Sequence, residues 1–491
     1  MNQELKPETF YKYIYFKMTN KIDKNRPADS VQFGEGNFLR AFVDYCIQLL
    51  NEQTLFQGKV DVVQPIAQGM IKNLADQNGK YHVYSEGISN GKSVRKSHLI
   101  TCINQLVDPY QDFEKYLSLA ENVNLKFIFS NTTEAGIQQI DTDQMEMQPP
   151  NSFPAKLVLF LLRRFEKFNG SNDKVLHIIP CELIEKNGDT LKTILLDIID
   201  QWELEIGFKN WVMKNHFYNT LVDRIVPGFP KDNLTFYQQG MSFEDNLIVT
   251  CEPFFLWVIE GNRKLLDIFP ADQLGEIDVK VVKDLGNYRT RKVRILNGCH
   301  TAMVPVGLLK VVETVSAALS DGFMKEFISE TLENEIIPSI DFDKQELTEY
   351  AAQVLERFSN PFTVHQLQSI ALNSISKYKV RVLPSLLSFY KKNNIIPKNL
   401  TFSLASLIYF YGKDISKHSY NLKDDPVIVD FFKNTWKAKS IDEITKTVLS
   451  NESLWGQNLA KIIPLRKDIS QVLKLLKNQN LVVAFENYKS S

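Results

Sequence analysis

A short run near the middle of the chain carries the residues best suited to chemistry. Lys292, Asn297 and His300 fall within nine residues, in the sequence RTRKVRILNGCHTAMVPVG. Carbonyl reduction needs a hydride donor at the carbon, a proton donor at the oxygen, and polar groups that stabilise charge on that oxygen. The lysine can give the proton in reduction and remove it in alcohol oxidation, while the carboxamide and the imidazole can donate hydrogen bonds. The run therefore predicts reversible hydride transfer.

The lysine needs a lowered pKa for this role. Partial burial and the nearby cations Arg289, Arg291 and Arg294 could supply it, because both disfavour another positive charge. On an α-helix, the lysine, asparagine and histidine would fan out over an arc of ~140°. Asn297 and His300, three positions apart, would be direct neighbours. We therefore expect one helical face to line a cleft.

A second element can hold a nucleotide. A GxGxxL pattern at 34–39 follows a strand-like run and precedes a helical pattern over 37–53. The first glycine permits a tight turn, and the second lets the backbone approach a pyrophosphate, which a helix N-terminus favours electrostatically. Leu39 replaces the third glycine, so the helix and strand cannot pack in the usual close manner. The predicted cofactor-binding residues of this turn are Phe33, Gly34, Glu35, Gly36, Asn37 and Phe38.

The end of the next strand bears on the choice of nucleotide. The strand over 59–66 is stopped by Pro65, and Gln64 stands where an acidic residue would bind a ribose 2′-hydroxyl. Asp61 lies inside the strand, and no arginine stands beside Gln64 to bind a 2′-phosphate. We therefore expect Gln64 to contact the cofactor and NAD(H) to be favoured over NADP(H). The histidines have no metal-ligand spacing, so no metal is expected.

Strand and helix patterns alternate over the first half of the chain. Strand-like runs at 59–66, 125–130 and 174–183 are interspersed with helical runs, one over 154–168 and one that begins near Asp189 as a plausible cap. A hairpin turning at Asn90-Gly91 is also expected. This rhythm predicts a mostly parallel sheet with helices on both faces.

After about residue 287, strand-like runs become rare. Helices are expected over 312–334, 345–358, 363–377, 382–392, 401–411 and 467–476. The fold class is therefore α/β, with a Rossmann-like dinucleotide-binding domain over 1–286 and a largely α-helical substrate and catalytic domain over 287–491. We expect the active site in the cleft between these domains.

The composition limits the partners and the compartment. The chain has 491 residues and a net charge of -1, which suggests no nucleic acid partner. Its longest apolar stretches, at 157–162 and 254–259, are too short to span a bilayer, and the N-terminus shows no secretory signal. Five scattered cysteines fit a reducing cytosol. The expectation is a cytoplasmic protein acting on a small molecule, with no oligomeric partner indicated.

The run KVRILNGCH resembles the signature of the polyol-specific long-chain dehydrogenases, the mannitol dehydrogenase family. The likeness covers most of the chain through the blocks VQFGEGNFLRAF, SNTTEAG, CELIEKNG, LVDRIVP and CEPFFLWVIE. It implies that Lys292 is the catalytic acid/base and that Asn297 and His300 polarise the substrate oxygen. It also implies an active-site role for Asp223, for which an ion pair with Arg224 is the alternative.

The SNTTEAG block implies further contacts with the cofactor. By resemblance, Asn131 and Thr132 bind it and Glu134 lies near the nicotinamide. A carboxylate on a loop surface is the alternative for Glu134.

Two positions depart from the pattern of mannitol dehydrogenases. Leu183 stands where that family has an asparagine, so one oxyanion donor is missing, and Arg289 stands where it has a glutamate. A cation suits a carboxylated sugar, because arginine binds carboxylates in a bidentate fork. We expect Arg289, with Lys377 or Arg381, to bind the carboxylate. A surface arginine in a basic cluster is the alternative.

Within the family, several blocks resemble those of members that reduce keto-uronates, notably GEGNFLRAF, VVQPI and the run over 360–384. Phe38-Leu39-Arg40 lacks the histidine that mannitol and fructuronate-type members usually carry there. The resemblance implies NAD(H)-dependent interconversion of D-altronate and D-tagaturonate in hexuronate catabolism. The alternatives are fructuronate reduction, oxidation of mannitol or another polyol, and a catalytically silent nucleotide-binding sensor.

Overall fold

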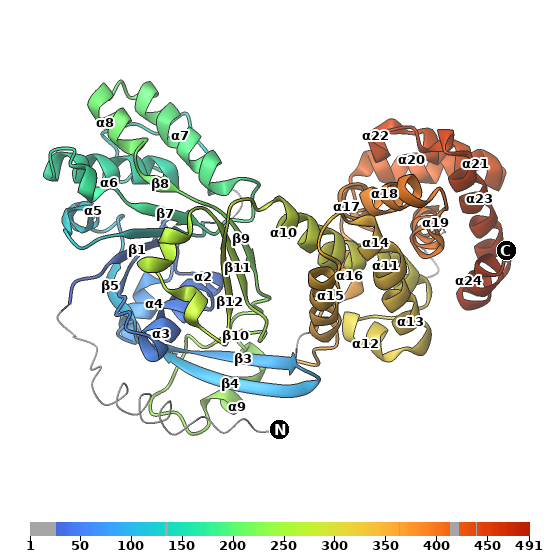
Figure 1. The fold of residues 1–491 in the computed structure, drawn as a ribbon, viewed down its shortest axis with the longest axis horizontal. Helices are drawn as coiled ribbons and strands as arrows, with labels where there is room; N and C mark the ends of the chain where they lie inside the picture. Colours follow the sequence, from blue (N-terminus) through green and yellow to red (C-terminus); the bar gives the residue numbers. More distant parts are fainter. Residues whose placement is uncertain (1–25, 133–135, 363, 413–421, 438) are drawn as a thin grey trace. The chain divides into compact units, whose positions relative to one another are not determined.

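The chain divides into two units in the computed structural model, which describes residues 26–132, 136–362, 364–412, 422–437 and 439–491. Unit 1 comprises Met1–Glu86 and Val94–Leu285, and unit 2 comprises Gly87–Ser93 and Gly286–Ser491 (Figure 1).

The central element of unit 1 is a six-stranded sheet whose paired strands all run parallel. In spatial order its strands are β5 (Ile103–Val107), β2 (Val60–Val63), β1 (Ser30–Phe33), β6 (Phe127–Ser130), β7 (His177–Pro180) and β8 (His216–Phe217). Phe33 at the end of β1 is level with Val63 of β2 and Ser130 of β6. The loops that follow these three strands therefore leave the sheet at one edge, where parallel sheets bind ligands.

Two apolar cores lie on opposite faces of this sheet, because successive side chains of a strand point to opposite sides. Ile128 belongs to the core that contains α6 and α7, whereas Phe127 and Phe129 belong to the core that contains α3 and Trp257. The second face is therefore shared between helices and additional strands. In the described part of unit 1, the α-helices are α2 (Asn37–Arg40), α3 (Val43–Gln53), α4 (Ile71–Asp76), α5 (Phe113–Ser118), α6 (Phe153–Lys167), α7 (Asn187–Gln201), α8 (Ile206–Val212) and α9 (Leu234–Gln238).

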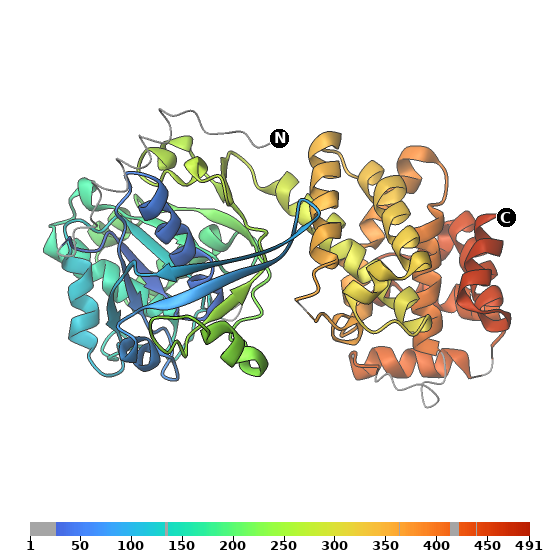
Figure 2. The same ribbon diagram turned by 90° about the horizontal axis from the view of Figure 1, so that it is seen from below.

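Two three-stranded sheets complete unit 1. Their strands are β10 (Val249–Cys251), β3 (Tyr81–Ser89) and β4 (Lys92–Ile100) in one sheet, and β12 (Asp278–Val282), β11 (Leu256–Glu260) and β9 (Asn219–Asp223) in the other. Strands β3 and β4 form a long two-stranded ribbon (Figure 2). Both turn residues between them, Asn90 and Gly91, have positive φ, as a two-residue Asn-Gly hairpin turn requires. The expected hairpin is therefore confirmed.

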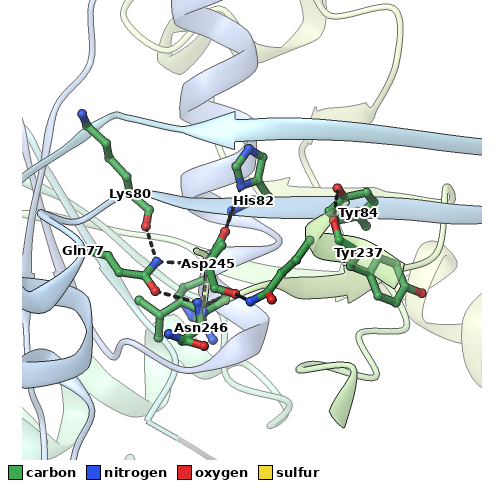
Figure 3. A network of polar contacts seen from close by, with 10 residues as sticks. Gln77, Lys80, His82, Tyr84, Tyr237, Asp245 and Asn246 are labelled. Atoms are coloured by element: carbon green, nitrogen blue, oxygen red, sulfur yellow. Dashed lines mark hydrogen bonds and ion pairs between the residues drawn. The ribbon is translucent and has the colours of Figure 1, made fainter. Parts of the chain in front are cut away.

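A buried carboxylate anchors the beginning of β3. Asp245 accepts hydrogen bonds from the backbone N–H of His82 at 2.6 Å and from the Gln77 side chain at 2.9 Å, and its carboxylate lies 2.9 Å from the His82 ring (Figure 3). Burial opposes ionisation of Asp245, but these hydrogen bonds lower its pKa overall. The next residues are held as well, since Leu247 accepts a hydrogen bond from Arg40 at the end of α2.

Two local expectations in unit 1 are wrong. The helix expected over 37–53 is broken at Ala41–Phe42, where the buried guanidinium of Arg224 binds the Ala41 carbonyl at 2.5 Å. Asp189 does not cap α7, because the N-cap position is held by Lys186 in a left-handed conformation. The Asp189 carboxylate instead accepts a hydrogen bond from Asn219.

Unit 2 is built from helices over its described residues, apart from the hairpin tip and the bridge between Thr314 and Gln366. α19 packs against both α11 and α23. No helix in the described ranges of the chain has the length and apolar character needed to cross a bilayer. The elements are α10 (Gly286–Arg291), the π-helix η6 (Lys292–Asn297), α11 (Gly298–Leu309), α12 (Val315–Ser320), α13 (Gly322–Glu330), the π-helix η7 (Thr331–Ile336), α14 (Ile337–Ser339), α15 (Lys344–Phe358), α16 (Leu367–Ile370), α17 (Ser374–Arg381), α18 (Leu383–Asn393), α19 (Lys398–Gly412), α20 (Pro426–Trp436), α21 (Ile441–Ser450), α22 (Glu452–Trp455), α23 (Ile463–Asn478) and α24 (Leu481–Lys489).

Two of the expected helices in unit 2 are divided. The helix expected over 312–334 breaks at Asp321, whose side chain accepts a hydrogen bond from Met324 N and caps α13. The helix expected over 363–377 becomes α16 and α17, with Asn373 between them in a left-handed conformation; residue 363 is outside the described ranges. Asp and Asn favour such breaks, because their side chains compete for backbone groups and suit caps and turns.

Candidate active site

The glycine turn after β1 is fixed from both sides. Gly34 N donates to Val63 O at 3.0 Å, and Asn131 N donates to Phe33 O at 3.1 Å. Gly34 has φ +118°, and a Cβ there would lie 2.8 Å from the carbonyl oxygen of Asn131. Only glycine fits this position. A Cβ on Gly36, by contrast, would meet nothing within 4 Å. The open space over Gly36 is suited to a pyrophosphate approaching the backbone.

The next residues of the turn contact other parts of unit 1. Asn37 accepts a hydrogen bond from Arg40 at 2.7 Å, and a Cβ on Gly228 would lie 2.3 Å from the Asn37 amide nitrogen. Phe38 stacks on Phe42, with ring centroids 4.8 Å apart. Phe33 is fully buried in the core of the sheet. Its side chain therefore supports the turn from below.

The loop after β2 is hydrogen-bonded to the side chains of Glu35 and Gln64. Glu35 accepts a hydrogen bond from Met70 N at 3.0 Å, while Gln64 donates to Ala67 O at 3.3 Å. Burial raises the pKa of Glu35, opposed by its backbone hydrogen bonds. Asp61 points away from this loop, accepting a hydrogen bond from Asn104 on β5 at 2.7 Å.

A glutamate that we did not single out from the sequence holds the loop after β6. Glu182 accepts hydrogen bonds from Thr132 N at 3.0 Å, Thr132 Oγ1 at 3.1 Å and Ser130 Oγ at 3.0 Å. Burial raises its pKa, opposed by these hydrogen bonds. Asn131 donates to Cys181 O at 2.7 Å. Asn131 and Thr132 are thus fixed beside the glycine turn, whereas Glu134 lies outside the described residues. An acidic residue two positions after the buried strand β7 is the signal by which Glu182 can be found in the sequence.

Asp223 is the last residue of β9 and is 5% exposed. The neighbouring Arg224 donates to Ala41 O and to Glu252 O. Gly228, which touches Asn37, follows five residues after Asp223, so the two segments share one region of unit 1.

Position 183 holds a leucine instead of the family's asparagine, and Asn187, the next asparagine in the sequence, does not take its place. Leu183 is 61% exposed. Asn187 is buried, and its carboxamide donates to Pro180 O and Thr220 Oγ1 while accepting from Thr220 N. The carboxamide of Asn187 therefore holds β7 to β9.

Lys292 and Asn297 are the two ends of the π-helix η6, and α11 follows with His300 in its first turn. The arc expected for an α-helix is therefore wrong between positions 292 and 297. In a π-helix, residues five apart are joined by one hydrogen-bonded turn, so Lys292 and Asn297 lie one turn apart. His300 then follows Asn297 at α-helical spacing. Single π-turns of this kind are frequent at functional sites.

The imidazole of His300 is held between two rings. It stacks on Phe358 with centroids 4.0 Å apart, and it meets His365 nearly edge-on at 5.1 Å. Burial lowers the pKa of His365. The side-chain carboxamide of Asn297 makes no hydrogen bond to any described residue, and its backbone carbonyl accepts from Thr301. Asn297 can therefore donate to a ligand.

Two cations on α17 lie beside this segment. A Cβ on Gly298 would lie 2.9 Å from Arg381 O, so the end of α17 packs directly against the start of α11. Lys377, one turn earlier, donates to Ile370 O at 3.0 Å. Burial and the charge of Arg381 lower the pKa of Lys377, and burial lowers that of Arg381.

The arginines around Lys292 occupy different places. Arg289 lies on α10, three residues before Lys292. Arg291 is packed on the rings of Tyr288 and Tyr350. Arg294 donates to Ser385 at 2.9 Å, and burial lowers its pKa. Arg291 and Arg294 thus have packing roles.

Two family models match the chain. The mannitol dehydrogenase Rossmann domain matches residues 28–268, and the mannitol dehydrogenase C-terminal domain matches residues 284–477. An altronate oxidoreductase of Yersinia pestis bv. Antiqua (strain Nepal516) is 39% identical over 472 residues, which is 95% of this chain and 98% of that protein. An altronate oxidoreductase of Bacillus subtilis (strain 168) is 42% identical over 465 residues, covering 94% of this chain and 95% of that protein.

Two solved structures share the fold. A substrate-free D-sorbitol dehydrogenase aligns with a TM-score of 0.79 at 19% identity, covering 95% of this chain and 96% of that one. Pseudomonas fluorescens mannitol 2-dehydrogenase, in a ternary complex with NAD and D-mannitol, aligns with a TM-score of 0.67 at 18% identity and covers 95% of each chain. The expected α/β class, a Rossmann-like domain followed by a helical one, is confirmed.

Proposed function

The chain belongs to the mannitol dehydrogenase family, and on that premise we propose that it interconverts D-altronate and D-tagaturonate with NAD(H). The observation that carries the proposal is the full-length identity of 39 and 42% to relatives named altronate oxidoreductase. The enzyme class is an oxidoreductase acting on a CH–OH group. We place the reaction in the cytoplasm, the compartment that the five free cysteines favour.

The residues of unit 1 fit a dinucleotide. The space over Gly36 admits a pyrophosphate, and Asn131 and Thr132 are fixed next to the turn by backbone and Glu182 contacts. NAD(H), when bound, donates or accepts the hydride. Gly34, Gly36, Asn131 and Thr132 would hold it, and the side chains that follow β1 and β2 would face its adenosine half.

The residues of unit 2 supply the proton and the oxyanion contacts. Lys292 protonates the carbonyl oxygen in reduction and removes the hydroxyl proton in oxidation. Asn297, one π-turn away, donates its free amide N–H to the same oxygen. His300 adds a second donor from an imidazole whose plane is fixed by Phe358. Each group thus acts on the substrate oxygen while the hydride moves at carbon.

The basic residues of unit 2 suit an acid sugar. A uronate carries one negative charge, which a neutral polyol lacks, and guanidinium groups bind carboxylates in pairs of hydrogen bonds. Arg381 is packed against the segment that carries Asn297 and His300, and Arg289 lies one turn before Lys292. We assign carboxylate binding to Arg289 and Arg381, with Lys377 adjacent on the same helix.

The test is NADH oxidation by the purified enzyme with D-tagaturonate, comparing the wild type with Lys292→Met. Loss of a general acid should lower kcat by about 10²- to 10⁴-fold and leave the Kd for NADH unchanged. Lys433→Met, an exposed lysine on α20, is the matched control and should behave as wild type. Unchanged turnover of Lys292→Met would refute the assigned mechanism. NADH binding without turnover of any keto-uronate or polyol by the wild type would instead indicate a silent sensor.

A further inference from the structure

We propose that Glu35, the residue between the two glycines of the turn, makes the enzyme select NAD(H) over NADP(H), with Gln64 as its partner. The inference rests on the proposed function, since it concerns the nucleotide that this function requires. It assigns to the turn after β1 a role that the end of β2 fills in most dinucleotide-binding folds.

In this chain, no acidic residue stands at the end of β2, where dinucleotide-binding folds usually have one. The residue that follows β2 is the neutral Gln64, and Asp61 within β2 is engaged by Asn104 on β5. A chain with this sequence would therefore lack the carboxylate that accepts a hydrogen bond from the adenosine 2′-hydroxyl. Glu35 brings one to the same place by another route.

The register of the sheet makes this possible. Phe33 and Val63 are level in adjacent parallel strands, and Gly34 N donates to Val63 O. Glu35 and Gln64 therefore leave the sheet side by side. A Cβ at Gly69, in the loop after β2, would lie 2.3 Å from Oε1 of Glu35 and 2.3 Å from Oε1 of Gln64. Both side-chain oxygens thus face the same residue of the β2 loop.

The loop is held in this arrangement by hydrogen bonds. Met70 N donates to Glu35 Oε1 at 3.0 Å, and Ile71 N donates to Gln64 Oε1 at 3.4 Å. Gln64 Nε2 donates back to Ala67 O. The Glu35 side chain is therefore positioned, rather than free to swing aside when a nucleotide arrives. Glu35 is only 6% exposed, so a second negative group near it would be weakly screened.

These features separate the two nucleotides. The 2′-hydroxyl of NAD(H) can donate to the carboxylate, whereas the 2′-phosphate of NADP(H) adds nearly two negative charges and no donor. Lys72, exposed near the start of α4, is a cation on the helix that follows the β2 loop, and its charge opposes this repulsion. The fixed carboxylate of Glu35 outweighs this single exposed charge.

Because burial raises the pKa of Glu35, the experiment measures the Kd of NADH and NADPH on the alkaline side, at pH 8, by isothermal titration calorimetry without substrate. The wild type should bind NADH at least about tenfold more tightly than NADPH. Glu35→Gln keeps an acceptor for Met70 N but removes the charge, and it should weaken NADH by about tenfold and tighten NADPH, because a hydrogen bond to a charged group is lost and a repulsion is removed. Glu166→Gln, an exposed carboxylate on α6, is the matched control and should leave both constants unchanged.

Gln64→Leu separates charge from loop structure. It disturbs the β2 loop but retains the carboxylate, so it should weaken NADH while keeping NADPH rejected. An unchanged NADPH-to-NADH ratio in Glu35→Gln, or equal binding of both nucleotides by the wild type, would overturn the inference and leave the dehydrogenase function standing. Failure of the wild type to bind either nucleotide would instead contradict the proposed function.

Discussion

The two glycines of the turn should fail in different ways when each is replaced by alanine. Gly34 has φ +118°, and its Cβ would press on a backbone carbonyl at 2.8 Å, whereas the Cβ of Gly36 would enter empty space at φ -70°. Strained backbone of the first kind costs about 1–3 kcal/mol, and the steric contact adds to it. We expect Gly34→Ala to lower the free energy of unfolding by about 2–4 kcal/mol.

Gly36→Ala should leave the free energy of unfolding nearly unchanged but weaken the binding of NADH. Alanine is somewhat worse than glycine at an N-cap, so the free energy of unfolding should fall by less than about 1 kcal/mol. The added methyl group, however, occupies the space assigned to the pyrophosphate, and overpacking by about 1.4 kcal/mol or more corresponds to at least about tenfold weaker NADH binding.

The assay pairs urea unfolding with a fluorescence titration of NADH. Gly275→Ala is the matched control, because its Cβ also meets nothing within 4 Å but lies in the loop before β12. It should change neither quantity. An unaltered Kd for NADH in a folded Gly36→Ala protein would refute the assignment of this turn to the pyrophosphate.

Three further predictions concern other parts of the molecule. Arg289→Ala should raise the KM for D-tagaturonate by about tenfold or more with little change in the Kd for NADH, because a charged hydrogen bond to the carboxylate is lost; an unchanged KM would rule out that contact. Glu182→Ala should lower the free energy of unfolding by about 1–3 kcal/mol and weaken NADH binding, because the N–H of Thr132 loses its acceptor; a wild-type NADH titration would contradict this. Burial, with His216 and Lys126, lowers the pKa of His177 to about 4 from 6.5, so its contribution to stability is present above pH 6.5 and is lost as the pH falls toward 4. Between pH 6.5 and pH 4, the free energy of unfolding of the wild type, measured with urea, should fall by about 1–2 kcal/mol more than that of His177→Asn, after a discount for the partly exposed ring. The same pH dependence of this free energy in both proteins would contradict the prediction.

Much of unit 1 could be predicted because its strands are short apolar runs bounded by turn residues. The sequence predicts the strand before Gly34 and the turn at Asn90-Gly91, and the structure has both; it also predicts a strand end at Gln64, and β2 ends one residue earlier, at Val63. The break at Ala41–Phe42 could not be predicted, because its cause is the guanidinium of Arg224, more than 180 residues away in the sequence.

The candidate site shows the same division. The spacing of Lys292, Asn297 and His300 is visible in the sequence, but the π-turn that brings the first two one turn apart depends on hydrogen bonding that residue types do not encode locally. In the sequence, the role of Glu182 cannot be told from that of any other acidic loop residue. This role depends on the hydrogen bond from Thr132, fifty residues away, which only the structure shows. Residue patterns predict local elements, but they do not predict which segments distant in the sequence will contact each other.

The preference of the enzyme for D-tagaturonate over D-fructuronate decides between the two keto-uronate reductions. Initial rates of NADH oxidation, with both keto-uronates supplied at a series of equal concentrations, give kcat/KM for each. We expect a clearly higher kcat/KM for D-tagaturonate. A higher value for D-fructuronate would contradict it.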